Sequence, residues 1–323
     1  MWARFGMLDW TGERFVPWAK EAAVAYEHLH RYIWASNFVE GKRVLDLASG
    51  EGYGAEILAR RASSVSGVDI DDEALRHASA RYRQTNLQFI KGCLTAVPIP
   101  GTHLFDVITC FEALEHIEQH DEMMREVKRL LKPDGLFIVS IPNKDTYNVD
   151  GGPNPFHVRE LAFDEFNALL TQYFSAVSFF GQRVRTSSSM WPLNGASVEP
   201  VQKFEVERRN GEFQMVDPGN RIPVYFVALA SQTSIKDCKG SILVDHSDIF
   251  IHDKDEALAW RAEQVEDLLK FTDYLQGELK SAQRQIQLQN DELEGMQRSR
   301  GWKLVLKVRA FRNRLIGNRY HPR

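Results

Sequence analysis

Residues 44–58 read Val-Leu-Asp-Leu-Ala-Ser-Gly-Glu-Gly-Tyr-Gly-Ala-Glu-Ile-Leu, an apolar run that ends in a glycine-rich turn and reopens as a helix. A second apolar run, at 65–70, carries Asp69, nineteen residues beyond Gly50. Glycines such as Gly50 and Gly52 let the backbone turn sharply and approach a ligand where a Cβ would collide. The pattern predicts a strand, a tight turn and a helix around a nucleotide-type cofactor.

Two acidic residues flank this turn. Asp69, at the tip of the neighbouring strand, can accept hydrogen bonds from both hydroxyls of a ribose. Asp46 precedes the glycines, where a carboxylate repels a pyrophosphate but attracts a cationic sulfonium amino acid. The glycine spacing alone would also fit a dinucleotide oxidoreductase, so Asp46 is the residue that favours a sulfonium cofactor.

With these residues the chain resembles class I S-adenosylmethionine-dependent methyltransferases. The likeness continues through 105–117, Phe-Asp-Val-Ile-Thr-Cys-Phe-Glu-Ala-Leu-Glu-His-Ile, and through 126–143, which look like the family's fourth strand and the helix-turn-strand after it. It covers roughly residues 10–232. The resemblance implies S-adenosylmethionine as cofactor, bound by Asp46, Gly50, Gly52, Asp69, Leu94 and Phe111. Cys93 stands where relatives often place an adenine-reading aspartate, so the Leu94 backbone is expected to take that role.

The segment before the first strand, 1–40, is expected to form a cap over the cofactor. It contains two stretches dense in polar and aromatic residues, Thr11–Pro17 and Tyr26–Tyr32. In methyltransferases of this kind a leading helix often covers the cofactor. Arg31 can bind the methionine carboxylate there, because a guanidinium pairs with a carboxylate through two hydrogen bonds.

Glu112, Glu115 and His116 follow the fourth predicted strand at positions i, i+3 and i+4, which share one face if the segment is helical. Two carboxylates and an imidazole suit Mg²⁺ or Mn²⁺. The Glu-x-x-Glu-His pattern looks like that of metal-dependent ubiquinone-pathway and small-RNA 2′-O-methyltransferases, and His157 stands where the latter carry a further histidine. A second interpretation is metal-free, with His116 or His157 as general base oriented by Glu115. A third is purely structural.

Strand-like and helical segments alternate through the middle of the chain. Strands are expected at 43–47, 65–69, 87–91, 105–110 and 135–140, with helices at 18–38, 53–61, 72–84 and 121–131. This alternation predicts an α/β fold, a Rossmann-like doubly wound parallel sheet over residues 41–232. A helix at 163–171 and strands at 174–181 and 223–230 are expected to close it with an antiparallel edge strand. The Ser-, Asn-, Gly- and Pro-rich insert 185–221 is expected to be a loop or lid.

A second kind of pattern fills the C-terminal part. After a predicted linker at 233–256, apolar residues recur in a heptad across 257–299, which predicts a coiled coil and self-association. Eight of its ten seam positions are apolar. They are Val265, Leu268, Leu275, Leu279, Ala282, Ile286, Leu293 and Met296, with Thr272 and Gln289 the polar two. The basic amphipathic tail 300–323 suits either an anionic membrane surface or an acidic protein patch.

Composition limits the location and the partners of the protein. The chain has 323 residues, three dispersed cysteines and no visible signal peptide, which predicts a reducing, cytoplasmic setting. If the tail takes the first of its two alternatives, the protein would lie peripherally on the inner membrane. Nine Lys or Arg and no acid lie between 298 and 323, so the net charge of −4 leaves −13 for residues 1–297. Such an acidic region argues against a nucleic-acid substrate.

The motif set also resembles bacterial methyltransferases of surface-polysaccharide assembly, including those of O-antigen chain termination. That likeness implies O-methylation of a sugar hydroxyl or phosphate on a glycan or nucleotide-sugar. Two alternatives stay open: a small-molecule O- or N-methyltransferase, acting for instance on a quinone precursor or amino sugar, and a non-catalytic coiled-coil scaffold for glycosyltransferases.

Overall fold

The computed structural model describes residues 16, 22–147, 154–189, 203–209, 212–217, 221–236, 238–246 and 249–317. The chain divides into two compact units, Met1–Phe250 and Ile251–Arg323. Apart from Val16, the Thr11–Pro17 segment lies outside the described residues, as do positions 18–21 of the first predicted helix. The proposed boundaries of the cap, linker and tail therefore stay predictions.

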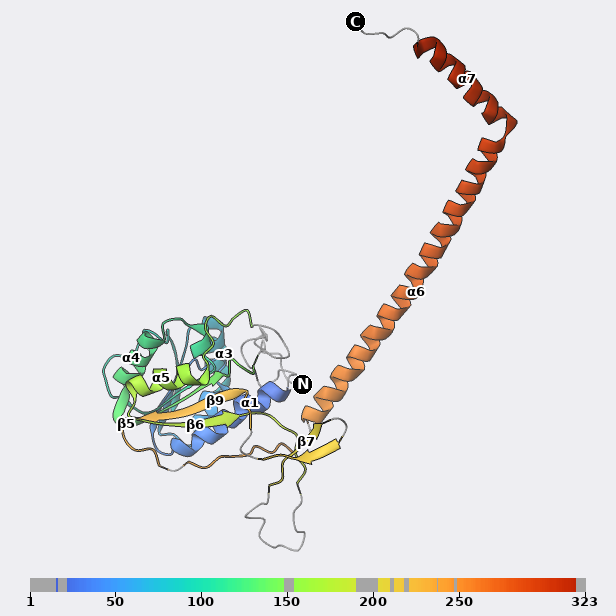
Figure 1. Cartoon of the computed structure of the whole chain (residues 1–323). Coiled ribbons are helices and arrows are strands. Elements are labelled where there is room, and N and C mark those ends of the chain that lie inside the picture. Colours follow the sequence, from blue (N-terminus) through green and yellow to red (C-terminus); the bar gives the residue numbers. More distant parts are fainter. Residues whose placement is uncertain are drawn as a thin grey trace. The chain divides into compact units, whose positions relative to one another are not determined.

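The first unit is built on a seven-stranded sheet with the order β3-β2-β1-β4-β5-β9-β6. Figure 1 labels three of its strands, β5, β9 and β6. β1 to β5 pair in parallel, whereas β9 runs antiparallel to both of its neighbours, β5 and β6. The predicted Rossmann-like sheet is confirmed, although the antiparallel strand lies beside the edge and β6 is the edge itself. The strands are β1 (Arg43–Leu47), β2 (Ser64–Asp69), β3 (Leu87–Lys91), β4 (Phe105–Phe111), β5 (Leu131–Pro142), β6 (Ala176–Gln182) and β9 (Tyr225–Ser231).

Helices cover both faces of this sheet, because successive strand residues point to opposite sides. Leu45 packs in one apolar cluster together with α4 and α5, whereas its neighbour Val44 packs in a second cluster with α1 and α2. Both side chains are fully buried, as expected for a parallel sheet covered on both faces. The helices are α1 (Ala22–Ala35), η1 (Ser36–Phe38), α2 (Tyr53–Ala59), α3 (Asp72–Arg81), η2 (Leu114–His116), α4 (His120–Leu130) and α5 (Phe163–Tyr173).

β5 is longer than the strand predicted at 135–140 and contains an irregularity. Phe105 of β4 pairs with Leu131, and Val107 already pairs with Leu136, so β5 advances five residues while β4 advances two. Four residues, Lys132-Pro-Asp-Gly135, thus stand against the single residue Asp106, and their Pro-Asp-Gly sequence is the turn of the helix-turn-strand segment predicted within 126–143. The turn residues are thus accommodated as a bulge inside the strand.

The excursion between β6 and β9 contains a hairpin that the sequence patterns do not reveal. β7 (Val206–Arg209) pairs antiparallel with β8 (Glu212–Met215), within the insert expected to be plain loop. Val206 lies opposite Met215 and Arg208 opposite Phe213, so these four side chains share one face of the hairpin. That face is largely exposed, with Phe213 at 73% and Met215 at 68%.

Two helices make up the described part of the second unit, α6 (Ile249–Arg298), whose first two residues belong to the first unit, and α7 (Arg300–Gly317). They are shown in orange and red in Figure 1. α6 begins eight residues before 257, so the end of the predicted linker is helical. Ser299 separates the two helices and caps α7, since its Oγ accepts a hydrogen bond from the Trp302 amide at 3.1 Å. Side chains at 262–315 are exposed. Among the described residues no helix combines the length and apolarity needed to cross a bilayer.

We expect α6 to associate with a second copy of itself, because its exposed seam repeats every seven residues and only a partner with the same repeat buries it throughout. Leu279 and Ile286 of the seam are both 58% exposed in the single chain. Replacing Ile286 by Lys should weaken association at least about tenfold, since each copy loses about 2 kcal/mol of apolar burial. Light scattering across a dilution series measures this change.

The matched control is Gln287→Lys, which adds the same charge at the neighbouring position off the seam. Gln287→Lys should leave the molar mass of the associated protein, measured by light scattering, unchanged. A wild-type chain that remains monomeric at tens of micromolar would refute self-association through α6.

Candidate functional site

The glycine turn after β1 is held by a backbone contact to Asp69. Ala48, Gly50 and Gly52 all have positive φ, at 57°, 56° and 95°. The amide of Gly50 donates to Asp69 Oδ2 at 2.8 Å, and the amide of Asp71 donates to Oδ1 at 2.9 Å. Asp69 therefore stands beside the turn, as the sequence predicts, with each carboxylate oxygen fixed by one amide and able to accept a further hydrogen bond.

Close packing against protein side chains explains two of the glycines. A Cβ at Gly52 would lie 2.7 Å from the Phe89 ring, and one at Gly54 would lie 2.1 Å from the ring of Tyr32. At Gly52, where a close approach to a ligand is predicted, the close neighbour is therefore a protein side chain, and the same holds for Gly54. Gly50 is the glycine whose amide faces the proposed ribose-binding carboxylate.

Asp46 lies beneath the turn and is completely buried. The hydroxyl of Tyr32 lies 3.2 Å from each of its oxygens, and Thr109 Oγ1 donates to Oδ1 at 2.7 Å. Burial raises the pKa of the Asp46 carboxyl to about 7, although both hydrogen bonds act in the opposite direction. An added cation nearby would favour the ionised form of this group.

Tyr32 connects α1 to the turn and to the fourth strand. Its ring meets Tyr53 edge-on at 5.3 Å and Phe111 at 4.9 Å between centroids. Phe111, predicted to lie near the cofactor, is thus a buried side chain at the end of β4.

Leu94 lies after β3 and packs against the apolar cluster on the α4 side, while Cys93 Sγ lies 3.1 Å from Thr95 Oγ1.

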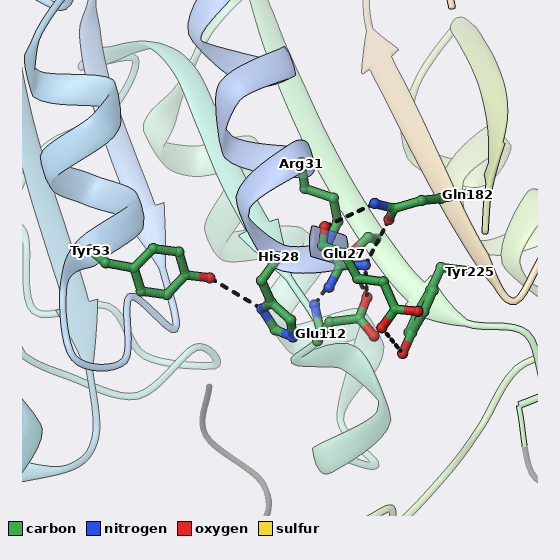
Figure 2. A network of polar contacts seen from close by, with 8 residues as sticks. Glu27, His28, Arg31, Tyr53, Glu112, Gln182 and Tyr225 are labelled. Atoms are coloured by element: carbon green, nitrogen blue, oxygen red, sulfur yellow. Dashed lines mark hydrogen bonds and ion pairs between the residues drawn. The ribbon is translucent and has the colours of Figure 1, made fainter. Parts of the chain in front are cut away.

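Arg31 is the centre of a buried polar network between α1, β4, β6 and β9 (Figure 2). Its Nη1 donates to Gln182 Oε1 at 2.8 Å and lies 3.7 Å from Glu112 Oε1. The guanidinium carbon stands 4.8 Å from the centroid of the Tyr225 ring. Two further nitrogens, Nε and Nη2, are buried and have no hydrogen-bond partner among the described residues.

Glu27 completes this network from the preceding turn of α1. Tyr225 donates its hydroxyl to Glu27 Oε2 at 2.9 Å, and Gln182 Nε2 donates to the Glu27 carbonyl at 2.8 Å. Burial raises the pKa of the Glu27 carboxyl. The two partnerless nitrogens of Arg31 fit an incoming carboxylate, since buried N–H groups are costly to leave unbonded and a carboxylate can bridge two of them.

Glu112 does not join Glu115 and His116, so the predicted shared helical face is wrong. Glu112 has φ of 50°, a left-handed conformation that interrupts any helix, and only Leu114–His116 forms a 3-10 turn. Ser140 donates its hydroxyl to the Glu112 carboxylate, which lies on the Arg31 side of the site. Glu112 is therefore removed from the expected metal ligands and assigned to the Arg31 network.

Glu115, His116 and His157 do come together, from segments about forty residues apart in the sequence. Within the described part of the chain, one side-chain atom from each lies within 4.8 Å of the others in a grouping that could hold a cation. His116 Nδ1 lies 3.0 Å from the Phe156 carbonyl, and His157 Nδ1 lies 2.7 Å from Glu160 Oε1. Because these oxygens accept hydrogen bonds, both rings carry a proton on Nδ1. The Nε2 of His157 accepts a hydrogen bond from the Asn154 side-chain amide at 3.1 Å, so a ligand there would displace that amide.

Glu115 is buried, and its Oε2 has no hydrogen-bond partner among the residues that the structure describes. Burial and then the negative charge of Glu112 raise the pKa of its carboxyl well above the ordinary range. The strand–turn backbone is tied to the His157 loop here, since the Glu115 carbonyl accepts hydrogen bonds from the Val158 and Arg159 amides. The cluster joins a carboxyl group that has one unbonded oxygen to two oriented imidazoles, which is suited to proton removal or cation binding.

Sequence reasoning missed the residues that hold this site together. Tyr32 stands in a motif quoted above, but nothing local reveals that it touches Asp46. Gln182 and Tyr225 come from paired positions of β6 and β9, and only the sheet register brings both to Arg31. Glu160 could have been noticed, because it lies only three residues after His157, to whose Nδ1 it bonds.

The chain is similar to several methyltransferases. Residues 45–139 match the protein-family model described as "Methyltransferase domain". A protein of Mycolicibacterium smegmatis, named "Probable S-adenosylmethionine-dependent methyltransferase", is 36% identical over 173 residues, 50% of this chain and 63% of that protein. The "Ubiquinone biosynthesis O-methyltransferase" of Actinobacillus pleuropneumoniae is 37% identical over 118 residues, 34% of this chain and 49% of its own length. The matched region thus spans less than two thirds of each relative.

Among solved structures, the YcgJ protein from Bacillus subtilis shares 22% sequence identity with this chain. The superposition covers 64% of this chain and 100% of that one, with a TM-score of 0.45. The topology of the sheet itself, with its single antiparallel strand beside the edge, is the Rossmann-like arrangement described above.

The raised pKa of Glu115 makes stability depend on pH. The folded protein keeps the Glu115 proton at pH values where the unfolded chain, with an ordinary carboxyl, has lost it. This contribution is therefore fully present below about pH 4 and is lost as the pH rises toward the folded pKa. Between pH 5 and 7.5 the wild type should lose about 1–3 kcal/mol more unfolding free energy than Glu115→Gln does. Urea denaturation at both pH values measures it.

The control is Glu118→Gln, at an exposed position. Its free energy of unfolding should change with pH as that of the wild type does over the same range. Equal pH slopes for the wild type and Glu115→Gln would show that Glu115 ionises normally in the folded protein.

Proposed function

We propose that this chain, which carries a class I S-adenosylmethionine-dependent methyltransferase domain, is an O-methyltransferase that deprotonates its acceptor hydroxyl at the Glu115–His116–His157 cluster. The observation that carries the proposal is the convergence of these three side chains next to the end of β4. In sheets of this kind ligands bind outside the carboxyl ends of the strands, where the glycine turn and the cluster both lie.

S-adenosylmethionine fits the residues around the turn. The buried Nε and Nη2 of Arg31 lack partners among the described residues and would hold the methionine carboxylate. Asp69, already fixed by two amides, would accept the ribose hydroxyls. The bound cofactor supplies a methyl group on a positively charged sulfur, so the protein itself must position the acceptor and remove its proton.

Asp46 supports the choice of a cationic ligand. Its carboxyl is buried, holds two hydroxyl hydrogen bonds and has a pKa near neutrality, at about 7. A positive ligand above the turn would stabilise the ionised form, so binding would expel a proton wherever the free protein holds one. A pyrophosphate would have the opposite effect and be repelled.

Glu115, His116 and His157 would hold a divalent cation, and without Glu112 this set of one carboxylate and two imidazoles suits Mn²⁺ better than the harder Mg²⁺. Each histidine donates Nδ1–H to a carbonyl or carboxylate oxygen, the arrangement that orients ligating imidazoles in metal sites. The unbonded Oε2 of Glu115 would gain a partner. A cation there lowers the pKa of a hydroxyl bound to it. The metal-free reading, in which one imidazole accepts the proton directly, is the alternative outcome of the test below.

For the acceptor we propose a sugar hydroxyl of a surface glycan or nucleotide-sugar, the acceptor class of the polysaccharide methyltransferases that the motifs resemble. A cation held by one carboxylate and two imidazoles keeps coordination positions for a vicinal diol. A phenolic small molecule is the second candidate, because relatives 37% identical to this chain are named for ubiquinone biosynthesis. A scaffold role is the third, and it requires no tight cofactor binding.

Cofactor affinity should depend on pH through Asp46. The free protein holds the Asp46 proton below about pH 7, and the cationic ligand favours its loss, so affinity rises with pH and levels off above 7. From pH 6 to 7.5 the dissociation constant should fall about three- to tenfold. Calorimetry at several pH values measures this.

The same titration with Asp46→Asn should be flat in pH, apart from the ionisation of the ligand itself. Absence of any S-adenosylmethionine binding by the wild type would support the scaffold and refute the enzyme.

Methyl transfer should require the cluster more than cofactor binding does. His157→Ala is expected to lower kcat about 100-fold or more while leaving cofactor affinity within about twofold, since the imidazole acts on the acceptor side. Transfer of isotope from labelled cofactor to a cell-envelope extract or a nucleotide-sugar measures the rate. The matched control is His103→Ala, whose imidazole contacts the Leu131 carbonyl outside the cluster.

Chelation then separates the two chemistries. Loss of activity with EDTA and its return with Mg²⁺ or Mn²⁺ are expected for the metal site. Full activity of the wild type in EDTA, together with loss of activity in His116→Ala, would assign proton removal to the imidazole alone. Full activity of both His116→Ala and His157→Ala would refute the proposed cluster.

A further inference from the structure

α7 has a composition unlike the rest of the chain. Its eighteen residues, Arg300–Gly317, contain six Lys or Arg and no Asp or Glu. α6, directly before it, contains eleven acidic and six basic residues. The change of sign occurs at the break between the two helices, at Ser299. α7 therefore differs in charge from the helix before it, and none of its residues has a role in the proposed methyl transfer.

Large apolar side chains form a stripe along α7. Leu304, Val308, Phe311 and Leu315 follow one another at intervals of four, three and four residues, which places them on a single helical face. All four are exposed, Phe311 at 67% and Leu304 at 64%. Exposed apolar faces of this kind mark a surface that is covered by a partner.

Cations border this stripe on both sides. Lys303, Lys307 and Arg314 precede Leu304, Val308 and Leu315 by one residue and so line one border at the helical spacing of 100° per residue. Arg312 follows Phe311 and lies at the other border. Long basic side chains in these positions can lay their methylene stems along an apolar surface and keep the charge at its polar boundary.

A second copy of α7 is a poor partner for this face. In a helix pair, residues beside the apolar seam meet those of the partner, and here every charged residue on both helices would be positive. α6 has both signs along its length and does not share this problem. The occupant of the α7 face must therefore combine an apolar layer with negative charge.

We infer that α7 lies in the interface of an anionic membrane, with the Leu304–Leu315 stripe among the acyl chains and the bordering cations at the lipid phosphates. An interfacial helix has this combination of an apolar face and a cationic boundary. The helix would lie on the bilayer, since no helix in the described ranges qualifies to cross it. Nucleic acid is disfavoured, because phosphate contacts require no stripe of four large apolar side chains and residues 1–297 carry a net charge of −13.

Flotation of the full chain with vesicles tests this inference. Binding to vesicles of phosphatidylglycerol mixed with phosphatidylcholine should exceed binding to pure phosphatidylcholine by at least about tenfold and should weaken in high salt. Replacing Lys303, Lys307 and Arg314 together by Gln should lower the affinity on the order of a hundredfold. Leu304→Gln with Phe311→Gln should abolish binding in high salt, where only apolar contacts remain.

The matched control is Lys280→Gln with Arg284→Gln, which removes two cations from α6 and should leave vesicle binding unchanged. Circular dichroism verifies that the variants keep their helix content. Equal binding to neutral and anionic vesicles, or undiminished binding after removal of 298–323, would overturn the inference. Tighter binding to duplex DNA than to anionic vesicles at the same salt would also overturn it.

Discussion

The hydrogen bonds that Tyr32 and Thr109 make to the buried Asp46 carboxyl are the constraint on which the site depends. They join α1, β1 and β4 beneath the glycine turn, in a place where an unpartnered carboxyl would be costly. Gly54 belongs to the same constraint, because any side chain there would displace the Tyr32 ring. Once Tyr32 is seated, the preceding residue, Arg31, is directed into the protein toward Glu112 and Gln182.

The buried charged groups near Asp46 do not all have partners. One guanidinium lies among two carboxyls, while two of its nitrogens have no partner within the described structure. A few residues away Glu115 is buried with one oxygen unbonded. Burial makes each of these groups expensive in the absence of a ligand, and the ligands proposed above would offset that cost. The buried polar atoms that lack hydrogen-bond partners in Arg31 and Glu115 thus belong to residues assigned to function.

The sheet could be predicted from sequence because apolar runs with glycine-rich ends are local signals, as at β1 and β2. The turn at Lys132–Gly135 was visible too, but its absorption into β5 as a bulge depends on pairing with β4. Glu112 illustrates the limit more clearly. Its spacing to Glu115 and His116 suggested a helical face, yet a single left-handed residue redirects the side chain to Arg31. The hairpin β7–β8 gave no periodic signal because its apolar face has only Val206 on β7 and Phe213 and Met215 on β8.

Gln182 and Tyr225, at the base of the long excursion between β6 and β9, have a double role. They pair directly across the two strands, so the chain leaves and re-enters the sheet at neighbouring points. Their side chains also bond to the α1 residues Arg31 and Glu27. The segment between Gln182 and Tyr225 could therefore be replaced by one of another length or sequence without changing the pairing of β6 and β9. A change in the excursion that displaced its first or last residue would, however, shift the Arg31 guanidinium, because Gln182 bonds to it and the Tyr225 ring lies against it.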